Sequence, residues 1–87
     1  MRMKLYQVAP EIGEQLFVAA ADTNRAAAIF AGFSLDAGWG LGLFAIERVD
    51  HDMPAKLQLG LDAMLKFGLE GIAVFERPLG WRVIPPG

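Results

Sequence analysis

The sequence contains no cysteine, a single histidine and very few hydroxyl side chains. Without cysteine, disulfides, thiolate metal sites and cysteine nucleophiles are excluded. The only hydroxyl groups are those of Tyr6, Thr23 and Ser34, and no G-x-S-x-G nucleophile elbow surrounds Ser34. These residues, with His51 as the lone histidine, favour a non-enzymatic protein with no cofactor and no metal.

Long apolar runs and clusters of basic residues are missing as well. No stretch approaches the roughly 18 apolar residues of a membrane-spanning helix. The apolar run before Pro10 is too short for the core of a signal peptide. Lysines and arginines are dispersed, and the formal net charge is −2. The sequence therefore predicts a cytoplasmic protein that does not enter a membrane, and it does not favour nucleic acid as a partner.

What the chain has in abundance is apolar side chains. Hydrophobic residues make up 54% of its 87 residues and charged residues 21%. This composition is typical of folded chains rather than disordered ones. The length predicts one small domain, spanning residues 1–87, with a small core.

The first half of the chain shows two strand-like segments, a helix and a third strand. Residues 3–8 and 15–21 predict a hairpin around Pro10 and Gly13. Asp22 is a favourable N-cap for the alanine-rich helix that follows. Three glycines in the segment 34–42 predict a loop, and residues 43–49 alternate as a strand does. On the helix, the residues predicted to face the core are Ala26, Ile29, Phe30 and Phe33.

The second half predicts another helix and another hairpin. Pro54 suits a first helical turn, and Gly68 suits the left-handed position just beyond a helix end. The apolar stripe between them consists of Leu57, Leu61, Met64 and Leu65. Two strand-like runs then flank the turn "RPLG". The order ββαβαββ predicts an α+β two-layer sandwich of about five mostly antiparallel strands, with both helices on one face.

The predicted strands carry more apolar residues than this two-layer architecture needs. The runs "LFVAAA", "LFAI" and "IAVF" are apolar at both alternating positions, so both sheet faces are expected to be apolar. Two helices on one face leave the other face open. We therefore expect a second copy or another protein to cover it, and a homodimer is predicted.

Aromatic residues on the predicted loop are candidates for the partner contact. Trp39 lies among glycines, and it is expected either to anchor a partner or to pack over the core as a lid. Trp81, in the last hairpin, fits cross-strand packing as well as partner contact. The candidate partner-binding residues are Trp39, Phe33, Leu35 and Trp81.

His51 stands between Asp50 and Asp52, and this triplet has a functional and a structural interpretation. A carboxylate beside a histidine can orient a general base or begin a metal site. In an extended segment, however, the two aspartates point away from the histidine. The structural interpretation makes an aspartate the helix cap and leaves His51 as a solvated loop residue. Phosphate binding by "GWGLG" is not predicted, because a strand rather than a helix follows it.

Three functional hypotheses follow from these patterns. The first is a small, cytoplasmic, homodimeric interaction module of bacterial type. The alternative is a small-ligand-binding domain or minor enzyme, with a pocket near the Trp39 loop and His51 at its rim. The third is a nucleic-acid regulator with a composite basic patch formed by Arg48, Arg77 and Arg82.

Overall fold

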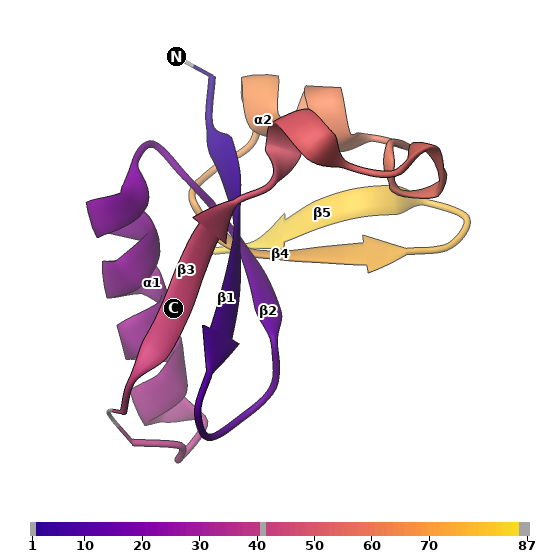
Figure 1. Ribbon diagram of the computed structural model, residues 1–87. Coiled ribbons are helices and arrows are strands. Elements are labelled where there is room, and N and C mark those ends of the chain that lie inside the picture. The colour runs from indigo at the N-terminus through magenta and orange to yellow at the C-terminus, as the bar shows by residue number, and fades with distance from the viewer. Residues whose placement is uncertain (1, 41, 86–87) are drawn as a thin grey trace.

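The computed structural model describes residues 2–40 and 42–85, which form one sheet and two α-helices (Figure 1). The sheet has five strands, all paired antiparallel, in the order β3-β1-β2-β4-β5. The predicted ββαβαββ order is confirmed. The elements are β1 Lys4–Pro10, β2 Leu16–Ala20, α1 Thr23–Asp36, β3 Phe44–Arg48, the 3-10 turns η1 Asp50–Asp52 and η2 Ala55–Leu57, α2 Leu61–Phe67, β4 Gly71–Glu76 and β5 Gly80–Ile84.

The two helices lie on opposite faces of the sheet, which corrects the prediction that both share one face. Neighbouring strand residues point to opposite faces, so Tyr6 and Leu5 belong to different cores. The α1 core contains Tyr6, Val8, Val18, Ala20, Ala26, Ile29, Phe30 and Ile72. The α2 core contains Leu5, Ala19, Leu61, Met64, Leu65, Ala73 and Trp81. The layers are therefore helix, sheet and helix, and α2 covers part of the apolar surface that the sequence assigned to a partner.

Helix α1 begins as its sequence predicts. Asp22 is the N-cap, and its carboxylate accepts the backbone N–H of Arg25 at 2.8 Å. The helix continues to Asp36, so the segment predicted as a loop from Ser34 starts later than expected. It stops where Gly38 takes the left-handed conformation at φ 81°.

Helix α2 is shorter than predicted. Pro54 is extended, with ψ 150°, and Gly60 adopts the left-handed conformation at φ 77°, so residues before Leu61 form only 3-10 turns. The predicted left-handed role of Gly68 is wrong, because Gly68 is extended at φ −77°. The predicted apolar stripe still packs inward: Leu61, Met64 and Leu65 are buried, and Leu57 is half-buried.

Asp50 ends the pairing between β1 and β3. Its carboxylate accepts the backbone N–H of Leu5 at 3.1 Å and the Nε of Arg48 at 2.9 Å, and its side chain is only 5% exposed. Burial opposes ionisation, but the hydrogen bonds from Arg48 and Leu5 outweigh it and hold the pKa of Asp50 below its ordinary value. Asp50 therefore provides an acceptor for the backbone of β1 and does not act as the N-cap of α2, the role that the sequence allowed for it.

Glu70 makes a second carboxylate link, between the start of β4 and the start of α1. It accepts the backbone N–H of Ala21 at 3.2 Å and the Nη2 of Arg25 at 3.1 Å. The hydrogen bond from Arg25, followed by that from Ala21, holds the pKa of Glu70 below its ordinary value.

Replacing Asp50 by Asn should lower the free energy of unfolding at neutral pH by about 1–3 kcal/mol, because a buried charged acceptor is lost. The lowered folded-state pKa means that Asp50 stabilises the protein above the unfolded value of about 3.9 and ceases to do so as the pH falls through the folded value. Denaturant unfolding from neutral to acid pH should therefore show a weaker pH dependence in the variant. Asp52→Asn, at an exposed neighbouring position, is the control and should change little.

Candidate functional site

Strand β3 is an edge of the sheet whose outer side carries free backbone groups. The N–H of Val49 donates to the C=O of Leu5, and the N–H of Glu11 donates to the C=O of Leu43, both at 2.9 Å. Backbone groups alternate in direction along an antiparallel strand, so those of Phe44, Ile46 and Arg48 point away from β1. The described part of the chain places no strand beyond them.

The opposite edge, β5, is partly closed. The backbone N–H of Trp81 donates to the C=O of Leu59 at 3.2 Å, so the segment before α2 runs along this edge. Pro85 follows the strand and has no N–H to offer. Of the two edges, β3 is therefore the less obstructed one for pairing with another chain.

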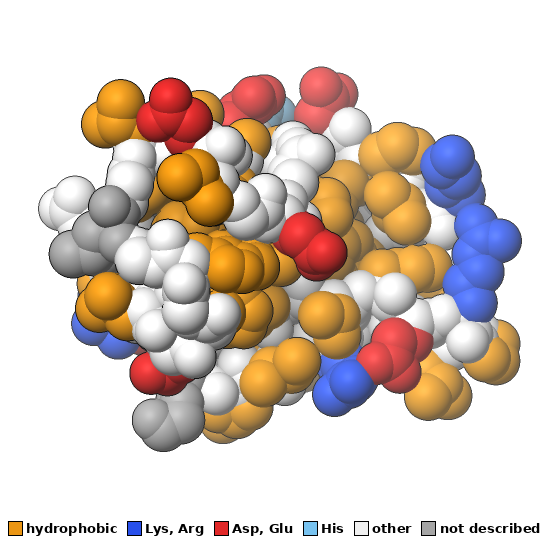
Figure 2. Space-filling view, turned by 90° about the horizontal axis from the view of Figure 1, so that it is seen from below, with side chains coloured by type: hydrophobic (Ala, Val, Ile, Leu, Met, Phe, Trp, Pro, Cys, Tyr) orange, Lys and Arg blue, Asp and Glu red, His pale blue; other side chains and the backbone are white. Residues whose placement is uncertain are grey.

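Apolar side chains surround the open edge at its beginning. Leu43 is 78% exposed and Ile12, in the turn between β1 and β2, is 71% exposed. Both line a shallow depression with Pro10 and Trp39. Figure 2, which views the molecule from below, shows hydrophobic side chains at the surface between isolated charged ones. An edge strand with apolar neighbours is the type of surface that other chains recognise.

A second exposed apolar region lies between α2 and the end of β5. It forms a groove of about 420 Å³ lined by Met64, Phe67, Leu69, Val83 and other residues. Phe67 and Leu69 are both exposed. The edge strand β5 borders this groove at Trp81, Arg82 and Val83, and the C=O of Leu59 accepts the N–H of Trp81 on this edge.

The four residues proposed for partner binding do not form one surface. Trp39 and Phe33 pack edge to face, with ring centroids 5.4 Å apart, against the α1 core. Leu35 is exposed on α1. Trp81 is buried on the opposite face, where its Nε1–H donates to the C=O of Leu57 at 2.6 Å. Trp81 therefore packs across the strands, which is the role that the sequence offered as the alternative to partner contact.

Trp39 rests on the turn between β1 and β2. A Cβ atom on Gly13 would lie 2.5 Å from Cε3 of Trp39, so the indole covers this glycine closely. Gly13 also has φ 110°, a conformation that glycine adopts most readily. Trp39 therefore closes one end of the α1 core, while part of its ring still reaches the surface beside Ile12.

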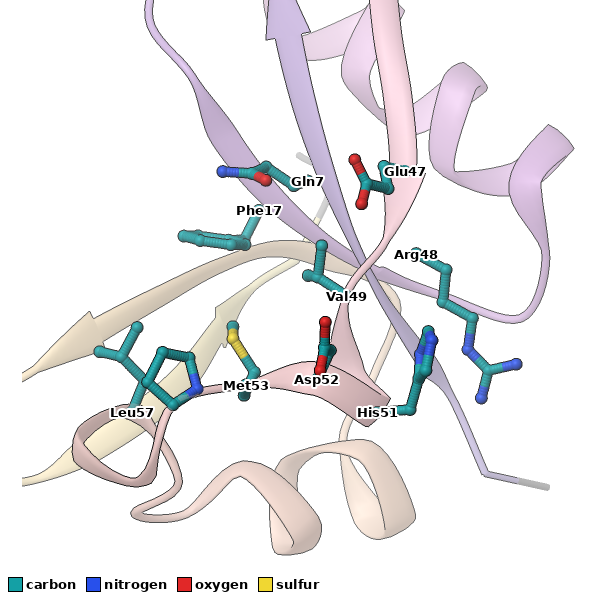
Figure 3. A pocket seen from close by; sticks show the side chains of 10 residues that line it. Gln7, Phe17, Glu47, Arg48, Val49, His51, Asp52, Met53 and Leu57 are labelled. Carbon is teal, nitrogen blue, oxygen red and sulfur yellow. The ribbon is translucent and has the colours of Figure 1, made fainter.

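His51 lies at the rim of a cavity of about 280 Å³ on the α2 face of the sheet (Figure 3). The cavity exists because α2 is short and leaves the β3 side of this face to the two 3-10 turns. Its residues come from β1, β2, β3 and the segment after β3, a combination with no local sequence pattern. The lining residues are Gln7, Phe17, Glu47, Arg48, Val49, His51, Asp52, Met53, Pro54 and Leu57.

The arginines of the proposed basic patch are not gathered at one place. Arg48 is on β3 and pairs with Asp50 at 2.9 Å. Arg82 is on β5, at the other edge of the sheet, and pairs with Glu76 at 2.5 Å. Arg77 lies in the turn that precedes β5, on the side of Arg82. The three side chains therefore belong to two separate parts of the surface.

No family model, curated protein or solved structure matches this chain. Within residues 2–40 and 42–85, no helix is long and apolar enough to cross a membrane. Over the same residues, no three His, Asp or Glu side chains are grouped closely enough to hold a metal ion.

Substituting Trp39 tests its role as a cover for the core. Trp39→Ala should lower the free energy of unfolding by about 2 kcal/mol, less than for a fully buried tryptophan because the ring is only half-buried. Gly13→Ala should also destabilise, by about 1–3 kcal/mol, and shift the Trp39 emission. Gly32→Ala is the control: its Cβ meets nothing, so a gain of up to about 1 kcal/mol is expected. Unchanged stability of Trp39→Ala would contradict the role as a lid.

Proposed function

We propose that this protein is a small, non-enzymatic protein–protein interaction module that acts as a homodimer joined through β3. The observation that carries the proposal is the row of outward backbone groups at Phe44, Ile46 and Arg48 on an edge with no neighbouring strand in the described chain. Another strand added there would satisfy these groups and lengthen the sheet.

The side chains of β3 support pairing with an identical strand. In an antiparallel arrangement centred on Ile46, this residue faces the partner's Ile46, and Phe44 faces the partner's Arg48. These residues carry the outward N–H and C=O groups, so each pair can exchange both backbone hydrogen bonds. Ala45 then faces the partner's Glu47, and no two like charges are directly opposed.

The remainder of the surface supports a closed pair rather than a longer assembly. A symmetric contact uses the same edge of both copies and leaves no second β3 edge free. The other edge, β5, is obstructed at Trp81 by Leu59. The exposed Leu43, just before β3, and Ile12 beside it would add apolar contact area to the backbone hydrogen bonds.

Charge substitutions at Ala45 test both the dimer and its register. Ala45 is exposed, so the protomer should fold with either charge at this position. Ala45→Glu places a carboxylate opposite the partner's Glu47 twice in each dimer. The substitution should therefore weaken the dimer and raise its Kd by roughly 2- to 30-fold. Ala45→Lys places an ammonium group there and should leave the dimer as tight or tighten it. Sedimentation equilibrium over a range of concentrations measures both.

Ala9→Glu is the matched control for these variants. Ala9 pairs with Ala45 across β1 and β3 and is also exposed, but it lies one strand inside the edge. It should leave the dimer Kd unchanged. A wild-type protein that remains monomeric at high micromolar concentration would refute the dimer, and equal effects of glutamate and lysine at position 45 would refute the register.

A further inference from the structure

The cavity beside β3 combines an apolar floor with two carboxylates that form no ion pair with any described residue. Phe17, Val49, Met53 and Leu57 supply apolar surface, and all are half-buried. Glu47, on β3, and Asp52, at the end of η1, supply negative charge. A pocket of about 280 Å³ lies just below the usual size range for ligand sites and suits a single side chain or a small molecule.

The basic residues nearby do not neutralise these two acids. Residues on β3 alternate, so Glu47 and Val49 face the cavity while Arg48 points toward the α1 side. Arg48 and His51 also line the cavity, and Figure 3 shows their side chains on the far side of it from Gln7, Phe17 and Met53. The guanidinium of Arg48 is held by Asp50, at 2.9 and 3.1 Å. The ion pairs found among the described residues include neither Glu47 nor Asp52.

We propose that this cavity binds an aliphatic ammonium group, that of a lysine side chain or of a free diamine. The apolar stem lies against Phe17, Met53 and Leu57, and the ammonium lies between the carboxylates of Glu47 and Asp52. The amide oxygen of Gln7 is a further acceptor.

This site does not depend on the β3 dimer. In the proposed register, the side chain nearest to Glu47 from the other copy is the partner's Ala45, which is too small to fill the cavity. An ammonium ligand can therefore enter the monomer or the dimer, and a test of binding stands whether or not the protein dimerises.

Three probes that share an aliphatic stem separate charge recognition from simple apolar contact. They are Nα-acetyl-lysine methylamide, whose side-chain ammonium is free, the diamine cadaverine, and N-acetyl-norleucine methylamide. The norleucine probe keeps the apolar stem without the charge. Each is titrated into ¹⁵N-labelled protein, and backbone amide shifts are followed by NMR. The lysine amide should shift the amides of Gln7, Phe17, Glu47 and Met53, and norleucine should shift them much less.

Two variants test the carboxylates. Glu47→Gln and Asp52→Asn should each weaken binding of the charged probes by roughly two- to fivefold, because each removes one partly exposed ion pair. Both residues are exposed, so folding should be retained, and the protein spectrum verifies this. Asp36→Asn removes the same charge at an exposed position at the end of α1, outside the cavity, and should leave binding unchanged.

Each outcome decides the proposal. Shifts with cadaverine but not with the lysine amide support the site and identify a free diamine as its ligand, and the reverse identifies a lysine side chain. Equal shifts with norleucine overturn the proposal, since the cavity would then select for apolar volume only. No shifts with either cation, or unchanged affinity in both carboxylate variants, overturn it as well.

Discussion

The structure depends on the need to cover a sheet that is apolar on both faces. Tyr6, Val8 and Val18 point to one side, and Leu5, Ala19 and Ala73 point to the other. A chain of 87 residues has two α-helices to cover them, so each face receives one. Each helix alone is too narrow to cover five strands, because a helix with its side chains is only about 10–12 Å wide. The layered arrangement therefore leaves parts of the sheet to loops and 3-10 turns.

The uneven length of the two helices determines where the surface is incomplete. Helix α1 has 14 residues and contacts four of the strands, whereas α2 has 7 and packs mainly on β5. The 3-10 turns after β3 reach over the remaining part of the α2 face without filling it. The cavity at Glu47 results from this uneven coverage. The part of the second sheet face next to β3 is the part that α2 does not reach.

Much of this fold could be predicted from local patterns. Alternation identified the strands, "RPLG" identified the last turn, and Asp22 identified the start of α1, because each of these signals acts over a few residues. The start of α2 could not be found in this way. Its position depends on the left-handed Gly60 and on the bond between Trp81 and Leu59, which lie far apart in the sequence. Both helices were assigned to the same face of the sheet, which is wrong. The strand residues show that both sheet faces are apolar, but they do not show which helix covers each face.

The candidate site was less predictable than the fold. The aromatic residues selected from the sequence, Trp39 and Trp81, belong to different cores, since their apolar character fits burial as well as binding. The open edge could be identified only from the strand order, in which β3 pairs with β1 alone. The cavity unites Gln7, Phe17 and Glu47 from three strands, and no spacing in the sequence relates them.

Glu70 affects local unfolding, because it links the C-terminal hairpin to the start of α1. Its carboxylate is attached to the N-terminal half of the chain through Ala21 and Arg25, while its backbone leads directly into β4. Detachment of the C-terminal hairpin at Glu70 also removes the acceptor of the Ala21 N–H and of the Arg25 guanidinium. Local opening at Glu70 therefore also removes two contacts from the segment that starts α1.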